Sequence, residues 1–138
     1  MQNNSIEINI DHVSIQTADF KKAFDFYTKI LGLGVIKEPF IFKGSRTLAW
    51  LDAGRIQIEL YSVKNGKEPQ AYDDRRVGLD HVAFEVKDLD LAIIHFAENQ
   101  VKILKPPFLP PTDDPHQPRI AFIEGPDGEE IEIRERLF

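Results

Sequence analysis

Asp11-His12-Val13 near the start of the chain recurs as Asp80-His81-Val82, and these two tripeptides decide how the rest of the sequence is interpreted. Each copy is followed about fifty residues later by a strand-like stretch that carries one glutamate, at 56–60 and at 130–133. The two histidines are 69 positions apart, and the two glutamates, Glu59 and Glu132, are 73 positions apart. A unit of about 70 residues is therefore written twice.

Hydrophobic periodicity assigns the same order of elements to both copies. In the first copy it predicts a strand over 8–17, a helix over 20–31 that ends at Gly32 and Gly34, and strands over 35–41, 47–51 and 55–61. In the second copy it predicts a strand over 79–86 and a helix over 89–99 with Leu91, Ile94 and either Phe96 or Ala97 among its apolar positions. Three further strands are predicted over 103–104, 119–123 and 130–134. The predicted fold class is α+β, with two tandem βαβββ modules.

The two modules are expected to form one domain over 1–138, because one half alone would leave a face of its sheet uncovered. Module 1 is expected at about 6–63, a polar linker at about 64–78 and module 2 at about 79–136. Residues 105–118 hold six of the nine prolines, and each proline lacks a donor N–H. We therefore expect a stiff loop there rather than a central strand.

Composition excludes several classes of protein. The 138 residues, 42% hydrophobic and 29% charged, are typical of a globular domain. A net charge of −6 argues against nucleic acid or an anionic membrane as a partner, and no apolar run approaches the ~20 residues of a membrane span. The polar start at 1–5 predicts no signal peptide, and the absence of cysteine fits the cytoplasm and excludes thiolate metal sites. We expect a cytoplasmic domain that acts on a small molecule.

Strand parity places one histidine and one glutamate of each copy on the sheet face opposite the apolar residues. The pattern is clear for Glu59, His81 and Glu132, whereas Ile8 and Ile10 blur it for His12. Two imidazoles and two carboxylates suit a divalent ion such as Zn²⁺, Ni²⁺, Co²⁺, Mn²⁺ or Fe²⁺. The sequence thus predicts a metal held by two pseudo-symmetric halves through His12, Glu59, His81 and Glu132.

Other side chains on the same inferred faces are candidates for a substrate site. Four polar residues could orient a substrate, namely Ser14, Gln16, Gln57 and Tyr61. Three aromatic residues either form an apolar wall or belong to the core, namely Trp50, Phe40 and Phe108. Two histidines have no counterpart in the other copy. We assign His95 to the helix surface or its packing, and His116, in the proline-rich loop, is a secondary substrate-side candidate.

These residues resemble the vicinal oxygen chelate superfamily, which includes glyoxalase I, methylmalonyl-CoA epimerase, extradiol dioxygenases and fosfomycin or bleomycin resistance proteins. The resemblance covers about 8–134 and rests on both Asp-His-Val copies, on Phe26-Tyr27 before Leu31-Gly32-Leu33-Gly34, and on Gly125-Pro126-Asp127-Gly128-Glu129-Glu130-Ile131-Glu132. It implies paired βαβββ modules whose sheets curl into an open barrel around a metal, with the helices outside. It also implies that His12, Glu59, His81 and Glu132 match the family's four ligand positions.

The set of two histidines and two glutamates is most similar to that of glyoxalase I. The resemblance implies a lyase or isomerase that acts on neighbouring substrate oxygens through an enediolate-type intermediate. The metal would act as a Lewis acid, and Glu132 or Glu59 would move the proton on the adjacent carbon. Gln16 stands where glyoxalase I has an arginine, and Val63 where it has an asparagine. The resemblance therefore does not extend to the glutathione contacts.

Two alternatives stay open. An epimerase similar to methylmalonyl-CoA epimerase would use the same chemistry, although such epimerases often carry glutamine at the position of Glu59. A non-catalytic antibiotic-binding or resistance protein would use the same groove, but such proteins often lose the metal ligands. Extradiol dioxygenases fit less well, because they use two histidines and one carboxylate. The resemblance further implies a homodimer, with each barrel closed within one chain or across two. The sequence does not determine which metal is bound or which substrate is used.

Overall fold

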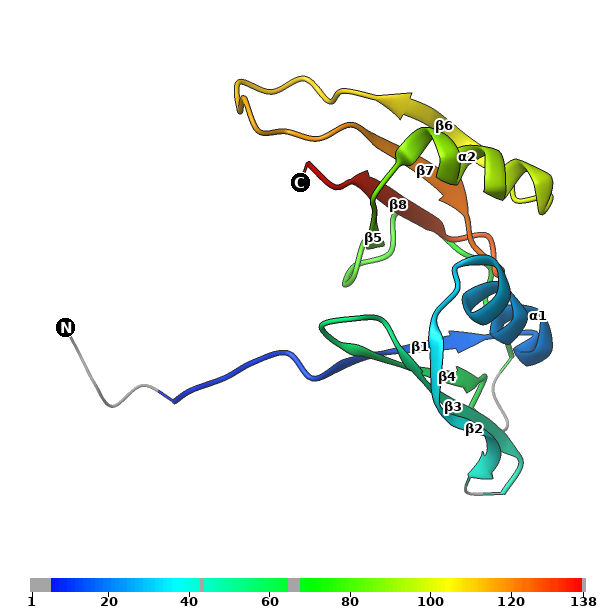
Figure 1. The fold of residues 1–138 in the computed structure, drawn as a ribbon. Coiled ribbons are helices and arrows are strands. Elements are labelled where there is room, and N and C mark those ends of the chain that lie inside the picture. The colour runs from blue at the N-terminus through cyan, green and yellow to red at the C-terminus, as the bar shows by residue number, and fades with distance from the viewer. Residues whose placement is uncertain (1–5, 43, 65–67, 138) are drawn as a thin grey trace. The chain divides into compact units, whose positions relative to one another are not determined.

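The computed structural model describes residues 6–42, 44–64 and 68–137, and the chain separates into two compact units (Figure 1). Unit 1 is Met1–Pro69 and unit 2 is Gln70–Phe138. The polar start at 1–5 and residues 65–67 of the expected linker lie outside the described residues. Each unit contains one four-stranded mixed sheet and one helical segment, in the order β-α-β-β-β. The predicted α+β class and order of elements are confirmed.

Unit 1 contains β1 (His12–Thr17), α1 (Phe20–Asp25), the π-helical turn η1 (Phe26–Ile30), β2 (Gly34–Phe42), β3 (Arg46–Asp52) and β4 (Gln57–Ser62). Its sheet has the order β1-β4-β3-β2. Strand β1 runs parallel to β4, and the other neighbours are antiparallel. The register pairs Ser14 with Glu59 and Glu59 with Trp50, so these three side chains lie in one row on one face of the sheet.

Unit 2 repeats this arrangement with β5 (Val82–Val86), α2 (Leu89–Glu98), β6 (Ile103–Phe108), β7 (Ile120–Glu124) and β8 (Glu130–Glu135). The order β5-β8-β7-β6 matches that of unit 1 strand by strand. The register pairs Ala83 with Glu132 and Glu132 with Phe122. The row that contains Glu59 in unit 1 thus has its counterpart around Glu132.

An aspartate caps the helix of each unit. The Asp19 carboxylate accepts a hydrogen bond from the backbone N–H of Lys22 at 3.1 Å, and Asp88 accepts one from Leu91 at 3.0 Å. Such a cap satisfies a backbone donor at the start of the helix and is worth about 1 kcal/mol. Because both caps follow the first strand directly, they set the same strand-to-helix turn in both units.

The core of each unit lies between its helix and one face of its sheet. In unit 1, Ile58 and Leu60 are at most 2% exposed, and in unit 2 the same is true of Ile131 and Ile133. Burying a side chain of this size stabilises a fold by about 1.5–3 kcal/mol. The helices contribute buried apolar residues of their own, among them Ala23, Tyr27, Leu89 and Phe96. The period of two along each strand then leaves the alternate residues on the opposite face.

The first strand of each unit begins three or four residues later than expected. Strand β1 begins at His12 rather than at position 8, and β5 begins at Val82 rather than at position 79. The preceding apolar residues are exposed, at 78% for Ile8, 67% for Ile10 and 70% for Leu79. No described strand pairs with these segments, and Figure 1 shows the dark blue segment before β1 running out as extended chain. Alternation of side chains does not by itself supply a hydrogen-bonding partner.

The helix predicted over 20–31 changes type after Asp25. The N–H of Leu31 donates to the carbonyl of Phe26 at 2.9 Å, five residues back, as in a π-helix. The Thr28 hydroxyl also donates to the Phe24 carbonyl at 2.7 Å, which is a contact that often bends helices. Gly32 ends the segment with φ of 77°, as predicted, whereas Gly34 is the first residue of β2.

Two other expectations need correction. Residues 105–108 of the expected proline-rich loop belong to β6. This is compatible with Pro106 and Pro107, because β6 is an edge strand where a missing N–H is tolerated. In α2, Leu91 and Ile94 are exposed at 63% and 54%, whereas Leu89 and Phe96 are buried. None of the helices in the described parts of the chain is long and apolar enough to cross a membrane.

Candidate functional site

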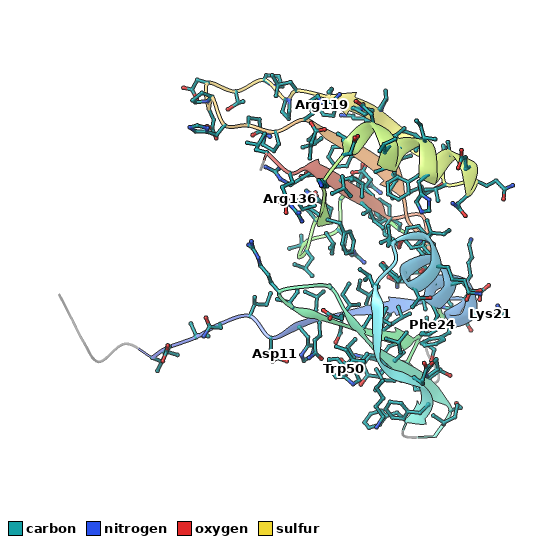
Figure 2. All side chains as sticks on the ribbon, viewed as in Figure 1. Asp11, Lys21, Phe24, Trp50, Arg119 and Arg136 are labelled. Atoms are coloured by element: carbon teal, nitrogen blue, oxygen red, sulfur yellow. The ribbon has the colours of Figure 1, made fainter. Side chains whose placement is uncertain are left out.

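In each unit, the sheet face opposite the helix carries one histidine and one glutamate, and we call it the His–Glu face. In unit 1 it carries His12 and Glu59, and in unit 2 it carries His81 and Glu132. Figure 2 labels Asp11 just before β1 and Trp50 on β3, and it labels Lys21 and Phe24 on α1. The parity prediction of one histidine and one glutamate on this face is therefore met within each unit.

The pair in unit 2 is the tighter one. His81 Nε2 lies 3.1 Å from Glu132 Oε1, and its Nδ1 lies 2.7 Å from Asp80 Oδ2. The second carboxylate oxygen of Glu132 accepts a hydrogen bond from Arg134 Nη1 at 2.9 Å. Glu132 is only 7% exposed. A carboxylate buried to this degree needs hydrogen-bond partners: Arg134 supplies one, and His81 supplies the other when its Nε2 carries a proton.

The pair in unit 1 has the same layout with different supporting groups. His12 Nε2 lies 3.7 Å from Glu59 Oε1, and its Nδ1 lies 2.8 Å from Asp11 Oδ2. The hydroxyl of Ser14, from the neighbouring strand β1, donates a hydrogen bond to Glu59 Oε1. A neutral hydroxyl therefore supports Glu59, whereas a cationic guanidinium supports Glu132.

An aromatic ring packs edge-on against each imidazole. The rings of His12 and Trp50 have centroids 4.8 Å apart and an angle of 81°, and those of His81 and Phe122 are 5.9 Å apart at 77°. Trp50 pairs with Glu59 and Phe122 with Glu132 across the strands, so both rings come from the same position in the fold. Each histidine is thus oriented by an aspartate and an aromatic ring.

The two Asp–His–Glu arrangements attract positive charge. An imidazole that donates its Nδ1 proton to aspartate has a lone pair on Nε2, and that lone pair faces a carboxylate oxygen in both units. A proton or a metal cation at Nε2 removes this repulsion. Accordingly, the hydrogen bond to Asp80 raises the pKa of His81, with a further contribution from Glu132 and against the opposing effect of burial.

Three of the four polar residues that were expected to line the site make contacts on the His–Glu face of unit 1, namely Ser14, Gln16 and Tyr61. Gln16 Oε1 accepts hydrogen bonds from Arg46 Nη2 at 3.0 Å and from the backbone N–H of Lys64 at 3.2 Å. The guanidinium carbon of Arg46 lies 4.0 Å from the centre of the Tyr61 ring. Loss of solvent, followed by the charge and hydrogen bond of Glu59, raises the pKa of Tyr61, so the phenol stays neutral.

The other candidates fall into different surroundings. Gln57 is exposed at the start of β4, in register with His12. Phe40 and Phe108 are half-buried on the edge strands β2 and β6, close to Lys37 and Lys105 respectively. His95 is exposed on α2 with its ring 5.8 Å from Phe96, and His116 is exposed in the loop between β6 and β7.

Sequence reasoning missed several groups of the His–Glu faces. The aspartates Asp11 and Asp80 were visible as part of the repeat, but a role on Nδ1 was not assigned to them. The lysines Lys37 and Lys105 occupy equivalent edge-strand positions, in register with Trp50 and Phe122. A repeated Lys-x-Pro-Phe pattern, at 37–40 and 105–108, could have revealed these two lysines. Lysine and proline also protect edge strands from pairing, so this repeat alone does not indicate a binding role.

Each unit by itself supplies two metal-ligand candidates. Across the described residues, no group of three or more His, Asp or Glu side chains could hold a metal ion. The expectation of a four-ligand site therefore stays a prediction, supported by two pairs with the same internal geometry.

Comparison with known proteins gives a consistent family. Residues 9–133 match the family model of the Glyoxalase/Bleomycin resistance protein/Dioxygenase superfamily. The chain is 30% identical to the uncharacterized protein YaeR of Escherichia coli (strain K12), over 92% of this chain and 95% of that protein. It is 27% identical to a probable lactoylglutathione lyase of Synechocystis sp., over 88% and 91% of the two chains. It is 24% identical to mitochondrial methylmalonyl-CoA epimerase of Bos taurus, over 69% and 56%.

A solved structure has the same fold. The crystal structure of SMU.1112c superposes with a TM-score of 0.77 at 26% sequence identity, and the match covers 93% of this chain and 98% of that chain.

Proposed function

Since the chain belongs to the glyoxalase/bleomycin resistance protein/dioxygenase superfamily, we propose that it is a divalent-metal-dependent lyase or isomerase with chemistry similar to that of glyoxalase I. Its substrate would be a small molecule with two neighbouring oxygen atoms. The observation that carries this proposal is the repeated Asp–His–Glu arrangement, in which Nδ1 of each histidine is held by an aspartate while Nε2 faces a glutamate.

The donor set fits a divalent cation. Histidine ligands of metals almost always donate the other ring N–H to a carboxylate, a carbonyl or water, and Asp11 and Asp80 stand in that position. His12, Glu59, His81 and Glu132 would hold the ion, and their nitrogen and oxygen atoms suit Zn²⁺, Ni²⁺, Co²⁺, Mn²⁺ or Fe²⁺. When bound, the ion would supply a Lewis acid that stabilises negative charge on the two substrate oxygens.

A glutamate would carry the proton. It would take a proton from the carbon next to one substrate oxygen and return it to the neighbouring carbon, so that the substrate is isomerised without gaining or losing atoms. Glu132 Oε2 already accepts a hydrogen bond from the cationic guanidinium of Arg134. The contacts therefore favour Glu59, whose described hydrogen bonds come from the neutral hydroxyls of Ser14 and Tyr61. Tyr61, next to Glu59 and neutral, could donate a hydrogen bond to the substrate.

Epimerisation is the second candidate reaction. It uses the same proton removal but returns the proton to the same carbon from the opposite side, and a second carboxylate, Glu132, is present for that step. The similarity to mitochondrial methylmalonyl-CoA epimerase covers 69% of this chain and supports it as the alternative. A homodimer also stays a proposal, in which the four ligands come from one chain or from two copies.

Two measurements test the proposed function. Purified full-length protein should bind a divalent metal, and it should exchange a substrate proton in deuterated water with either hemithioacetals or acyl-CoA thioesters. Exchange with the first group supports the glyoxalase-like reaction, and exchange with the second supports the epimerase. Glu59→Gln should abolish exchange. A different result would identify a non-catalytic binding protein. In that case the protein would bind no metal and exchange no proton, and His12→Ala and Glu132→Ala would both still bind the small molecule.

A further inference from the structure

Arg46, the first residue of β3, makes three contacts on the His–Glu face of unit 1. Its Nε donates to the Ser62 carbonyl at 3.1 Å, and its Nη2 donates to Gln16 Oε1 at 3.0 Å. Its guanidinium also stacks over the Tyr61 ring, 4.0 Å from the centroid. Long arginine side chains on a sheet surface normally keep many rotamers, and fixing one is costly in entropy. Three contacts from the two strands β1 and β4 fix the position of this guanidinium.

Within the described ranges, the positive charge of Arg46 has no carboxylate partner. It takes part in none of the ion pairs formed by the residues that the structure describes. The equivalent position in unit 2 is different. Glu85, four residues after His81 just as Gln16 is four after His12, accepts a hydrogen bond from Arg136 Nε at 3.0 Å. At this position unit 2 places a glutamate beside Arg136, which follows β8, whereas unit 1 places a neutral amide beside Arg46, which begins β3.

The position of Arg46 also relates it to the proposed reaction centre. Tyr61, which lies under the guanidinium, is two residues from Glu59 on β4 and shares its face. Two residues along a strand span about 7 Å. A group bound at Arg46 would therefore lie about one strand row from the carboxylate that is proposed to move the proton.

We propose that Arg46, positioned by Gln16 and Tyr61, binds an anionic group of the substrate, either a carboxylate or a phosphate. A guanidinium offers five N–H donors in a planar fork that matches both groups, and two of its nitrogens already serve Ser62 and Gln16. The substrate would then carry an anionic group several atoms away from its two reacting oxygens. That link to the reaction rests on the proposed function, whereas anion binding at Arg46 does not.

The test uses full-length, metal-free protein labelled with ¹⁵N and titrated at constant ionic strength with sodium phosphate or, separately, sodium acetate. The Arg46 Nε–H signal and the Gln16 side-chain amide should shift in a saturable manner, and the tighter of the two anions identifies the group. Arg46→Lys, which keeps the charge but loses the fork, should weaken the binding about tenfold. Gln16→Glu should abolish binding, because it gives Arg46 the carboxylate partner that Glu85 gives Arg136.

Arg55→Lys is the matched control, since Arg55 is exposed in the turn before β4 and outside this network. It should bind both anions as the parent protein does, and thermal melting should show that all variants are folded. Two results would overturn the proposal: no saturable shift up to about 100 mM of either anion, or equal affinity in the parent protein and in Gln16→Glu. Anion binding without metal binding or exchange would retain this inference and refute the proposed function.

Discussion

Replacement of Asp80 by asparagine should weaken metal binding without unfolding the protein. The Asp80 carboxylate lies 2.7 Å from His81 Nδ1 and fixes which ring nitrogen carries the proton. Loss of such a partner reduces metal affinity about 10–100-fold in metal sites generally. The side chain of Asp80 is 76% exposed, so water screens part of its charge. We therefore expect a loss near the lower limit, about tenfold, which corresponds to about 1.4 kcal/mol.

The assay is isothermal titration of full-length protein with Zn²⁺ or Ni²⁺ at pH 8. Metal binding needs an unprotonated Nε2, and the pKa of His81 is raised above its ordinary value of 6.5. Affinity should therefore fall as the pH is lowered through that raised value, and pH 8 keeps protons from competing with the metal. Asp11→Asn should give a similar loss, because Asp11 holds His12 in the same way at 2.8 Å.

Asp74→Asn is the control for Asp80→Asn, because it removes the same charge from an exposed residue of unit 2. It should leave metal affinity unchanged. The reasoning is refuted if Asp80→Asn binds metal as tightly as Asp74→Asn does, with both variants folded. It is also refuted if Asp80→Asn is harmless while Asp11→Asn is not, since the two aspartates are inferred to have the same role.

Three further outcomes are expected. Burial raises the pKa of Glu129, so the charged form of this side chain destabilises the fold. In urea unfolding, Glu129→Gln should therefore be more stable than the parent protein at pH 7. Below about pH 4, where Glu129 is protonated in both the folded and the unfolded state, the two proteins should be equally stable. Arg119 donates hydrogen bonds to Glu135 and lowers the pKa of that carboxyl group. Arg119→Met should therefore melt at a lower temperature than the parent protein at pH 7. The difference between the two melting temperatures should shrink as the pH falls through the lowered pKa of Glu135. Trp50 is the single tryptophan and packs on His12, so Co²⁺ should quench its fluorescence in the parent protein but not in His12→Ala.

The elements that sequence could predict are those set by local chemistry. The period of two along β4, β5 and β8 placed Glu59, His81 and Glu132 correctly opposite the apolar residues. Aspartate before each helix marked the strand-to-helix turn, because its carboxylate can only cap from that position. Repetition of both signals after about 70 residues was enough to predict the tandem modules.

The features that escaped prediction depend on partners distant in sequence. Arg46 contacts Gln16 across 30 positions, and only the strand order β1-β4-β3 brings their side chains to the same end of the sheet. Ile8 and Ile10 alternate as in a strand, but a strand also needs a neighbour to pair with, and no described strand takes that place. The π-helical turn after Asp25 depends on which carbonyl accepts from Leu31, and side-chain periodicity does not determine that choice.

The most direct test of the central claim is a metal titration of full-length protein with each of the four proposed ligands replaced in turn. If both His–Glu pairs share the ion, each of the four alanine variants should lower the metal affinity by at least about 100-fold, namely His12→Ala, Glu59→Ala, His81→Ala and Glu132→Ala. The parent protein should bind one metal ion per set of four ligands. If His12→Ala and Glu59→Ala bind metal like the parent while His81→Ala and Glu132→Ala do not, the ion belongs to one unit alone, and the duplicated site is contradicted.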